Sequence, residues 1–197
     1  LVNGKIKELM FKHDVKGKIW LMPIIESALG VLRVLEIAQS ENVVAMAIGL
    51  EDYTADLGTR RTQEANESFF ARSMIVNACK AACIQPIDSV FSDVNDMDAL
   101  KETVLRSKSL GFEGMGCIHP RQIRVIHENY APDDAEIEKA KKIVNAFLEA
   151  KAKGLGVVSL GTKMIDAPVV KRAQKIIDQA LSMGKLTLIW REEFLNS

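Results

Sequence analysis

The chain has 197 residues and carries 26 Lys and Arg against 26 Asp and Glu, so its formal net charge is zero. This balance argues against a nucleic-acid-binding protein, which usually shows a basic excess or a basic stripe. An apolar share of 48% argues against a disordered chain. No apolar run approaches the roughly 18 residues of a membrane span, and the charged first twenty residues do not form a signal peptide.

Three cysteines, Cys79, Cys83 and Cys117, form an odd set without framework spacing, which predicts reduced thiols and a cytoplasmic protein. Cys79 and Cys83 stand four residues apart in a helical pattern, which is the spacing of half a metal site. Two small buried apolar side chains are the favoured interpretation, since no complementary His or Cys pair occurs elsewhere. The first residue is Leu1, which indicates a processed chain or a piece of a longer one.

Short apolar runs alternate with helical patterns along the first two thirds of the chain. The predicted strands are Ile19–Ile24, Val43–Ile48, Ile87–Phe91 and Gly114–Ile118. The predicted helices are residues 1–12, Ala28–Ser40, Asn66–Cys83, Met97–Leu110 and Arg121–His127. Continuously apolar strands are typical of a parallel sheet that is buried on both faces. A strand followed by a helix, repeated four times, predicts an α/β fold.

The last third of the chain predicts two long helices around a glycine-rich loop. The first covers residues 133–151, with carboxylates in its first turn and lysines later, as the helix dipole favours. The loop Gly154–Gly161 continues with Thr and then Lys, in the wrong order for a phosphate loop, so a hinge or lid is favoured. The second helix covers Ala167–Met183, with Asp166 as N-cap and Pro168 in the first turn.

Two carboxylates are the main candidates for a functional site. Glu26 follows the first predicted strand and Asp52 follows the second, and in a parallel barrel the site lies at the carboxyl ends of the strands. Two carboxylates with no Lys or Arg in the same segments suit Mg²⁺, which is typically held by one or two carboxylates together with substrate and water. The alternative is that Glu26 or Asp52 caps the following helix, and spacing alone favours this alternative.

Two further polar segments follow the third and fourth predicted strands. Ser92–Asp98 is acidic but lacks the glycine and glutamate of a calcium loop, so a capping turn before the next helix is favoured. His119 either lines the site or is a hydrogen-bonded side chain at the rim, and the sequence leaves both open.

Seven segments in order carry a resemblance that spans nearly the whole chain. They are MPIIESA (22–28), GLEDYTADLG (49–58), FFARSMIVNA (69–78), PIDSVFSDVND (86–96), GFEG with CIHPRQI (111–114 and 117–123), YAP (130–132) and GTKMIDAPVVKRA (161–173). In this order they resemble the citrate lyase beta-subunit family, which includes malyl-CoA and citramalyl-CoA lyases and belongs to the phosphoenolpyruvate/pyruvate-type barrel aldolases.

The resemblance implies a role for each candidate residue. Glu26 and Asp52 are expected to bind Mg²⁺, and the backbone N–H groups around Glu51 and Asp52 to bind the substrate carboxylate. Asp166 is expected to act as an acid/base on a C-terminal lid that reaches a neighbouring subunit. Met115 stands where the family usually has Lys.

The resemblance also implies an activity and partners. The expected reaction is Mg²⁺-dependent cleavage of citryl-thioester to acetyl-thioester and oxaloacetate. The alternatives are a malyl-CoA or citramalyl-CoA lyase, or an inactive or structural subunit of the same fold. The expected partners are an acyl carrier protein or CoA thioester, a citrate lyase alpha subunit, and further copies of the chain in a trimer or hexamer.

The family has roughly a hundred further residues before this point, and an eight-stranded barrel takes about 250. We therefore predict the C-terminal half of a TIM (β/α)8 barrel over residues 1–130, with a helical lid or oligomerisation segment over 131–197. A half-barrel exposes two sheet edges and half of its core. The chain is therefore expected to associate with a partner, and to be weakly active or inactive alone.

Overall fold

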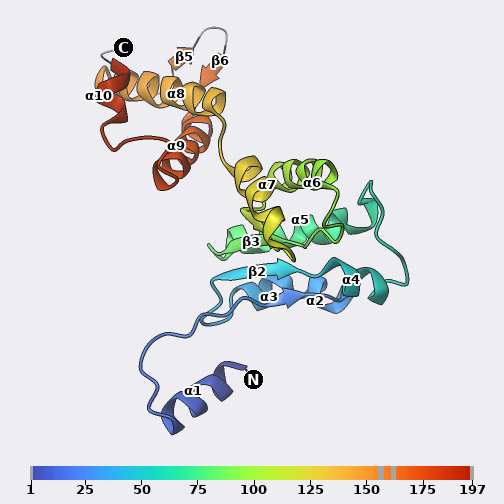
Figure 1. Ribbon diagram of the computed structural model, residues 1–197. Helices are drawn as coiled ribbons and strands as arrows, with labels where there is room; N and C mark the ends of the chain where they lie inside the picture. The colour runs from blue at the N-terminus through green and yellow to red at the C-terminus, as the bar shows by residue number, and fades with distance from the viewer. Residues whose placement is uncertain (1, 155–157, 161–162, 196–197) are drawn as a thin grey trace. The chain divides into compact units, whose positions relative to one another are not determined.

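The computed structural model describes residues 2–154, 158–160 and 163–195 (Figure 1). The helices are α1 (Val2–Lys12), α2 (Ala28–Leu32), α3 (Val34–Ala38), α4 (Leu50–Asp56), α5 (Asn66–Ala81), α6 (Met97–Leu110), α7 (Pro120–Tyr130), α8 (Asp134–Ala152), α9 (Ala167–Ser182) and α10 (Trp190–Leu195). The strands are β1 (Ile24–Ile25), β2 (Ala45–Ile48), β3 (Gln85–Asp88), β4 (Gly114–Met115), β5 (Val158–Leu160) and β6 (Lys163–Ile165).

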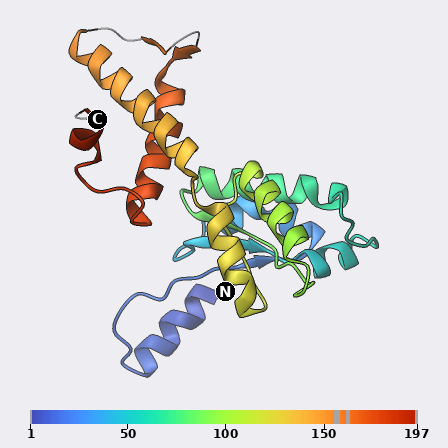
Figure 2. The same cartoon turned by 45° about the horizontal axis from the view of Figure 1, so that its top comes forward.

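The chain divides into two compact units, Leu1–Tyr130 and Ala131–Ser197. The first holds the sheet β1-β2-β3-β4 and its helices, and the second holds α8, α9, α10 and the antiparallel pair β5-β6 (Figure 2). Among the described residues, no helix is both long enough and apolar enough to cross a membrane. The roles expected for the two parts, barrel and lid, stay predictions.

The sheet of the first unit is parallel throughout. Ile24 pairs with Ala47, Ala47 with Ile87, and Ile87 with Gly114, so the strands follow one another in chain order. Parallel neighbours need crossover connections, and helices supply each of them here. The predicted α/β fold with about four parallel strands and their helices is confirmed.

The predicted strand boundaries are partly wrong. The first strand begins at Ile24, since Leu21 forms only an isolated bridge with Val43. The third strand ends at Asp88, where the chain turns toward α6, so it lies earlier than the apolar run suggested. The prediction of burial on both faces holds for β2, whereas in β1 Ile24 is 54% exposed beside Ile25 at 3%.

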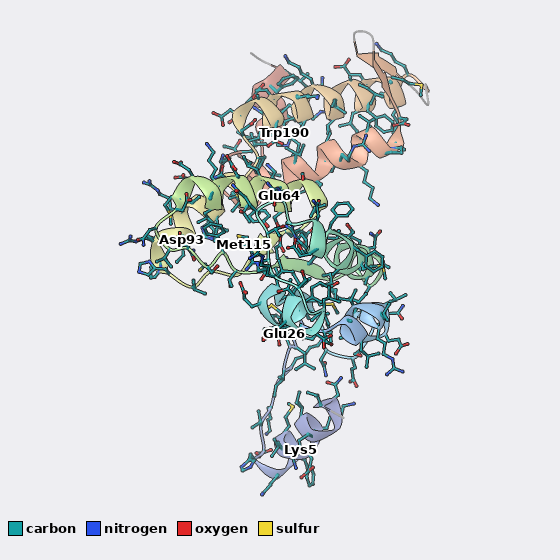
Figure 3. All side chains as sticks on the ribbon, turned by 90° about the vertical axis from the view of Figure 1, so that its right-hand side faces the viewer. Lys5, Glu26, Glu64, Asp93, Met115 and Trp190 are labelled. Atoms are coloured by element: carbon teal, nitrogen blue, oxygen red, sulfur yellow. The ribbon has the colours of Figure 1, made fainter. Side chains whose placement is uncertain are left out.

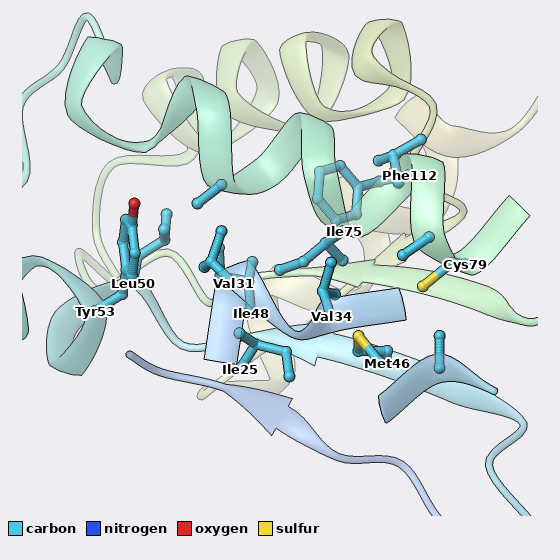
Figure 4. Packing of buried hydrophobic residues seen from close by; sticks show 14 of the residues in the cluster. Ile25, Val31, Val34, Met46, Ile48, Leu50, Tyr53, Ile75, Cys79 and Phe112 are labelled. Atoms are coloured by element: carbon cyan, nitrogen blue, oxygen red, sulfur yellow. The ribbon is translucent and has the colours of Figure 1, made fainter. Parts of the chain in front are cut away.

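The core of the first unit lies between the sheet and its helices (Figure 4). Met46 of β2 is fully buried, as are Ile75 and Cys79 of α5, the helix that packs on β2 and β3. Burying a Met or Ile side chain such as Met46 or Ile75 contributes roughly 1.5–3 kcal/mol. This packing holds the carboxyl ends of β1, β2 and β3 at one edge, where the candidate residues lie.

Local signals explain where several helices begin or end. Asp96 caps α6 by accepting from Ala99 N–H at 2.9 Å, which confirms the predicted capping turn, and Gly111 ends α6 at φ +103°. In the second unit Asp133 and Glu136 form a capping box at the start of α8. The predicted single helix over 28–40 is instead two short helices, because the backbone breaks at Arg33.

The interpretation of the cysteine pair is half right. Cys79 is buried, but Cys83 is exposed and lies beyond α5 at φ +57°, so it does not share the helix face. Burial raises the pKa of the Cys79 thiol to about 11.

We expect iodoacetamide at pH 8 to modify Cys83 and Cys117 in the folded chain and to leave Cys79 unmodified, because a buried thiol with a raised pKa is neither accessible nor ionised. Intact mass should show two labels in buffer and three in denaturant. A third label gained in buffer as fast as the first two would contradict the burial of Cys79.

Candidate metal and substrate site

Glu26 lies where β1 ends, directly beside the end of β2. Ile25 pairs with Ile48, and Gly49 N–H donates to Ile25 O at 2.9 Å, so the register sets Glu26 next to Gly49. A Cβ on Gly49 would lie 2.5 Å from Glu26 Cγ, closer than real atoms approach. Only glycine therefore lets the Glu26 side chain lie over this position (Figure 3 labels Glu26).

Asp52 lies three residues after Gly49, in the first turn of α4. Glu51 and Asp52 are both exposed there, and Gly49 is the N-cap. Within the described part of the chain, the backbone N–H groups of Glu51 and Asp52 have no hydrogen-bond partner. The first turn of a helix leaves such donors free, and they favour an anion.

A second contact ties α4 to the segment that carries Glu26. Asp56, the last residue of α4, accepts from Ala28 N–H with an N···O distance of 2.7 Å. Ala28 is two residues beyond Glu26 and begins α2. Both ends of α4 are thus held against the Glu26 segment, one through Gly49 and one through Asp56.

The capping alternative for these two carboxylates is wrong. Ser27 caps α2 by accepting from Gly30 N–H at 3.1 Å, so Glu26 is not the cap. Asp52 lies inside α4, after the N-cap Gly49. Among the described residues, neither carboxylate has a hydrogen-bond or ion-pair partner, which leaves both available to a ligand.

This pair of carboxylates fits the way proteins hold Mg²⁺. The described residues contain no group of three or more His, Cys, Asp or Glu side chains that could hold a metal ion. Mg²⁺ is commonly bound through one or two carboxylates and keeps its other positions for water and substrate. Glu26 and Asp52 would supply such a pair, and the open N–H groups of α4 would face an anionic substrate.

Arg61 adds a positive charge that the sequence did not predict at this edge. Its guanidinium donates to Glu51 Oε1 at 2.9 Å and to Val90 O at 3.2 Å. The Arg61 side chain is only 23% exposed, whereas that of Glu51 is 64% exposed. No residue spacing predicts this contact, because the irregular segment after α4 brings Arg61 back to the strand ends.

A buried ion pair lies beneath the same edge. Arg72 of α5 donates from Nε to Asp88 Oδ1 at 3.2 Å and pairs through its terminal nitrogen with Oδ2. Only 5% of the Arg72 side chain and 2% of the Asp88 side chain are exposed. The guanidinium lies over the Phe112 ring, 5.6 Å from the centroid.

A cavity of about 310 Å³ opens between α5, α6 and the end of β3. Its wall includes Arg61, Arg72, Ser89 and Met115, but neither Glu26 nor Asp52. Met115, which replaces the lysine that the resemblance leads us to expect, therefore adds an apolar group to this cavity.

His119 acts as a local hydrogen-bonding group. Its Nδ1 accepts from Arg121 N–H at 3.2 Å, at the start of α7. The fully buried Gln122 accepts from the His119 N–H and donates to Phe91 O. These contacts support the rim interpretation of the two that the sequence left open.

Asp166 belongs to the second unit, where it is the N-cap of α9. Its Oδ1 accepts from Val169 N–H at 3.2 Å, and within the described residues Oδ2 has no partner. The predicted cap is therefore confirmed, and the acid/base role stays a prediction. Half of the predicted glycine-rich loop that precedes it, residues 155–157 and 161, lies outside the described residues, and Val158–Leu160 of that loop form β5.

Comparison with known proteins decides the family. The sequence model of the HpcH/HpaI aldolase/citrate lyase family matches residues 5–120. Citrate lyase subunit beta of Escherichia coli K12 is 42% identical over 169 residues, which cover 85% of this chain and 56% of that protein. The chain belongs to the HpcH/HpaI aldolase/citrate lyase family. This confirms the resemblance on which the site residues were predicted.

Other members of the family show its range. The L-malyl-CoA/beta-methylmalyl-CoA lyase of Rhodobacter capsulatus is 33% identical over 183 residues, covering 84% of this chain and 58% of that protein. The chain spans little more than half the length of these relatives.

Solved structures agree with this assignment. Protein CitE of Mycobacterium tuberculosis, crystallised with magnesium, acetoacetate and coenzyme A, has a TM-score of 0.72 and 28% identity, covering 82% of this chain and 61% of that one. A citrate lyase from Burkholderia xenovorans LB400 has a TM-score of 0.80 at 23% identity, covering 91% of this chain and 58% of that one, and supports the fold alone.

Proposed function

We propose that this chain carries the metal and substrate site of a Mg²⁺-dependent carbon–carbon lyase that cleaves citryl-thioester to acetyl-thioester and oxaloacetate. The observation that carries the proposal is the Glu26 carboxylate lying over Gly49, beside the helix that presents Asp52. At this edge of the sheet, two unpartnered carboxylates are available to a cation and two open N–H groups are available to an anion. The magnesium and acetoacetate of the Mycobacterium tuberculosis relative support the same chemistry here.

Each of the candidate site residues has its own role in the proposed reaction. Glu26 and Asp52 would hold the metal, and the N–H groups of Glu51 and Asp52 would bind and orient the carboxylate of the oxo-acid fragment. When bound, Mg²⁺ would supply Lewis-acid stabilisation of the oxygen that becomes the ketone. The carboxylate of Asp166, on the lid of a neighbouring copy of the chain, would accept the hydroxyl proton as the carbon–carbon bond breaks and its electron pair forms the thioester enolate. The resulting carboxyl group would then return this proton to the enolate carbon.

Sequence identity supports the citryl substrate over the alternatives. The chain is 42% identical to the citrate lyase beta subunit but 33% identical to the malyl-CoA lyase. The acyl carrier protein, the alpha subunit, the trimer or hexamer and the exchange of lids between subunits belong to this proposal. The three free thiols support a reducing, cytoplasmic location.

Calorimetric titration of Mg²⁺ into the chain, with and without oxaloacetate, tests the proposed site. We expect oxaloacetate to bind only with Mg²⁺, and both Glu26→Gln and Asp52→Asn to weaken metal binding about 100-fold, since each removes one of two charged ligands. Glu36→Gln is the matched control, because this exposed carboxylate of α3 lies away from the strand ends. Equal binding by wild type and Glu26→Gln would overturn the assignment.

A further inference from the structure

Helix α4 has no side-chain cap from its own N-cap residue, unlike α2, α6, α8 and α9. Its N-cap is Gly49, which has no side-chain acceptor for the first N–H groups. A serine or aspartate at position 49 would displace the Glu26 side chain, which fills the space of a Cβ there. The close approach of Glu26 to Gly49 therefore leaves the start of α4 without a cap from its own segment.

Ser89, at the end of β3, supplies the missing acceptor from a neighbouring strand. Its hydroxyl oxygen accepts from the backbone N–H of Leu50 with an N···O distance of 3.2 Å. Leu50 is the first residue of α4, and Leu50 and Ser89 are each only 5% exposed. The bond joins positions 39 residues apart and fixes the turn that presents Glu51 and Asp52.

The buried ion pair holds Ser89 in turn. Asp88 Oδ1 accepts from the Ser89 N–H at 2.8 Å and from Arg72 Nε at 3.2 Å. These groups are buried and hydrogen-bonded to one another, so only one arrangement of the side chains at the end of β3 satisfies all of their hydrogen bonds. Arg72 is fixed on its other side by Phe112.

We propose that Ser89 is a positioning residue: held by the Arg72–Asp88 pair, it caps α4 from β3 and so places Asp52 for metal binding. The inference rests on the proposed function, because it takes Asp52 as a metal ligand. Ser89 itself touches neither metal nor substrate in this account. Its effect is to set the orientation of the first turn of α4.

Two measurements on Ser89→Ala test the proposal. We expect the Leu50 amide to exchange with D₂O about threefold to tenfold faster, as one lost hydrogen bond predicts, and the Mg²⁺ affinity in the presence of oxaloacetate to fall by a similar factor. Ser89→Thr keeps the hydroxyl and should retain both values within about twofold.

The matched control is Ser107→Ala. Ser107 is fully buried, and its hydroxyl is hydrogen-bonded to the Tyr130 hydroxyl at 2.6 Å, in a contact between α6 and α7. This variant should lose stability, leaving Leu50 exchange and Mg²⁺ affinity unchanged. A loss of Mg²⁺ affinity equal to that of Ser89→Ala would mean that stability alone sets the affinity, and would overturn the proposal.

The outcomes separate this proposal from the function on which it rests. Unchanged Leu50 exchange in Ser89→Ala, or faster exchange with unchanged Mg²⁺ affinity, overturns the positioning role and leaves the proposed function standing. If the wild-type chain binds no Mg²⁺ with oxaloacetate, the proposed function fails. Leu50 exchange then decides alone: faster exchange supports the cap from Ser89, and unchanged exchange overturns it.

Discussion

Replacing Asp88 with Asn is expected to lower the free energy of unfolding of the first unit by about 3–5 kcal/mol. The substitution preserves the shape of the side chain and its acceptor for the Ser89 N–H, but it leaves the Arg72 guanidinium buried without an anion. Arginine cannot lose its proton to escape this cost. Denaturant unfolding followed by circular dichroism measures the loss.

Adding a second substitution to Asp88→Asn tests the ion pair between Arg72 and Asp88. In Arg72→Met with Asp88→Asn both charges are absent, so roughly 1–3 kcal/mol of the loss should return. Glu128→Gln, which removes a partner of the exposed Arg124, is the control and should leave stability unchanged within error. A loss below about 1 kcal/mol in Asp88→Asn would mean that the pair is not sealed from water.

Replacing Gly49 with Ala is expected to weaken Mg²⁺ binding about 10- to 100-fold while leaving the fold intact. The new Cβ would occupy the space of the Glu26 side chain, so Glu26 must turn away into solvent. The backbone of Gly49, at φ −102° and ψ 96°, is accessible to alanine, so stability should change by less than about 1 kcal/mol. Calorimetry and denaturant unfolding on the same sample give both quantities.

Gly4→Ala is the matched control for this substitution. A Cβ on Gly4 meets nothing within 4 Å, and the residue lies within α1. It should stabilise the helix by about 0.5–1 kcal/mol and leave Mg²⁺ affinity unchanged. Wild-type Mg²⁺ affinity in Gly49→Ala would show that the position of Glu26 over Gly49 is unimportant for the metal.

Much of the fold follows from local pattern. The apolar run before Gly49 is long enough to identify β2, and Gly111 and Asp96 mark both ends of α6. Helix α4 was missed because seven residues show too little periodicity, and its cap comes from another strand. The strands β5 and β6 and the final helix α10 were also missed, because they are too short to show a periodic pattern.

Only the residues of the candidate site that follow predicted strands or match family motifs were predicted from the sequence. Glu26 and Asp52 each follow an apolar strand, and this is visible in the sequence. The contacts of Arg61, Arg72 and Ser89 join segments 10 to 39 residues apart. No spacing rule encodes such contacts, because they depend on how α4 and α5 pack against the end of β3.

Crystals of the chain grown with Mn²⁺ and oxaloacetate would show which residues bind the metal, since Mn²⁺ accepts the same oxygen ligands as Mg²⁺ and scatters anomalously. We predict an anomalous peak about 2 Å from carboxylate oxygens of both Glu26 and Asp52, with oxaloacetate completing the coordination. A peak bound by other groups, or none at this edge in crystals that contain oxaloacetate, would contradict it.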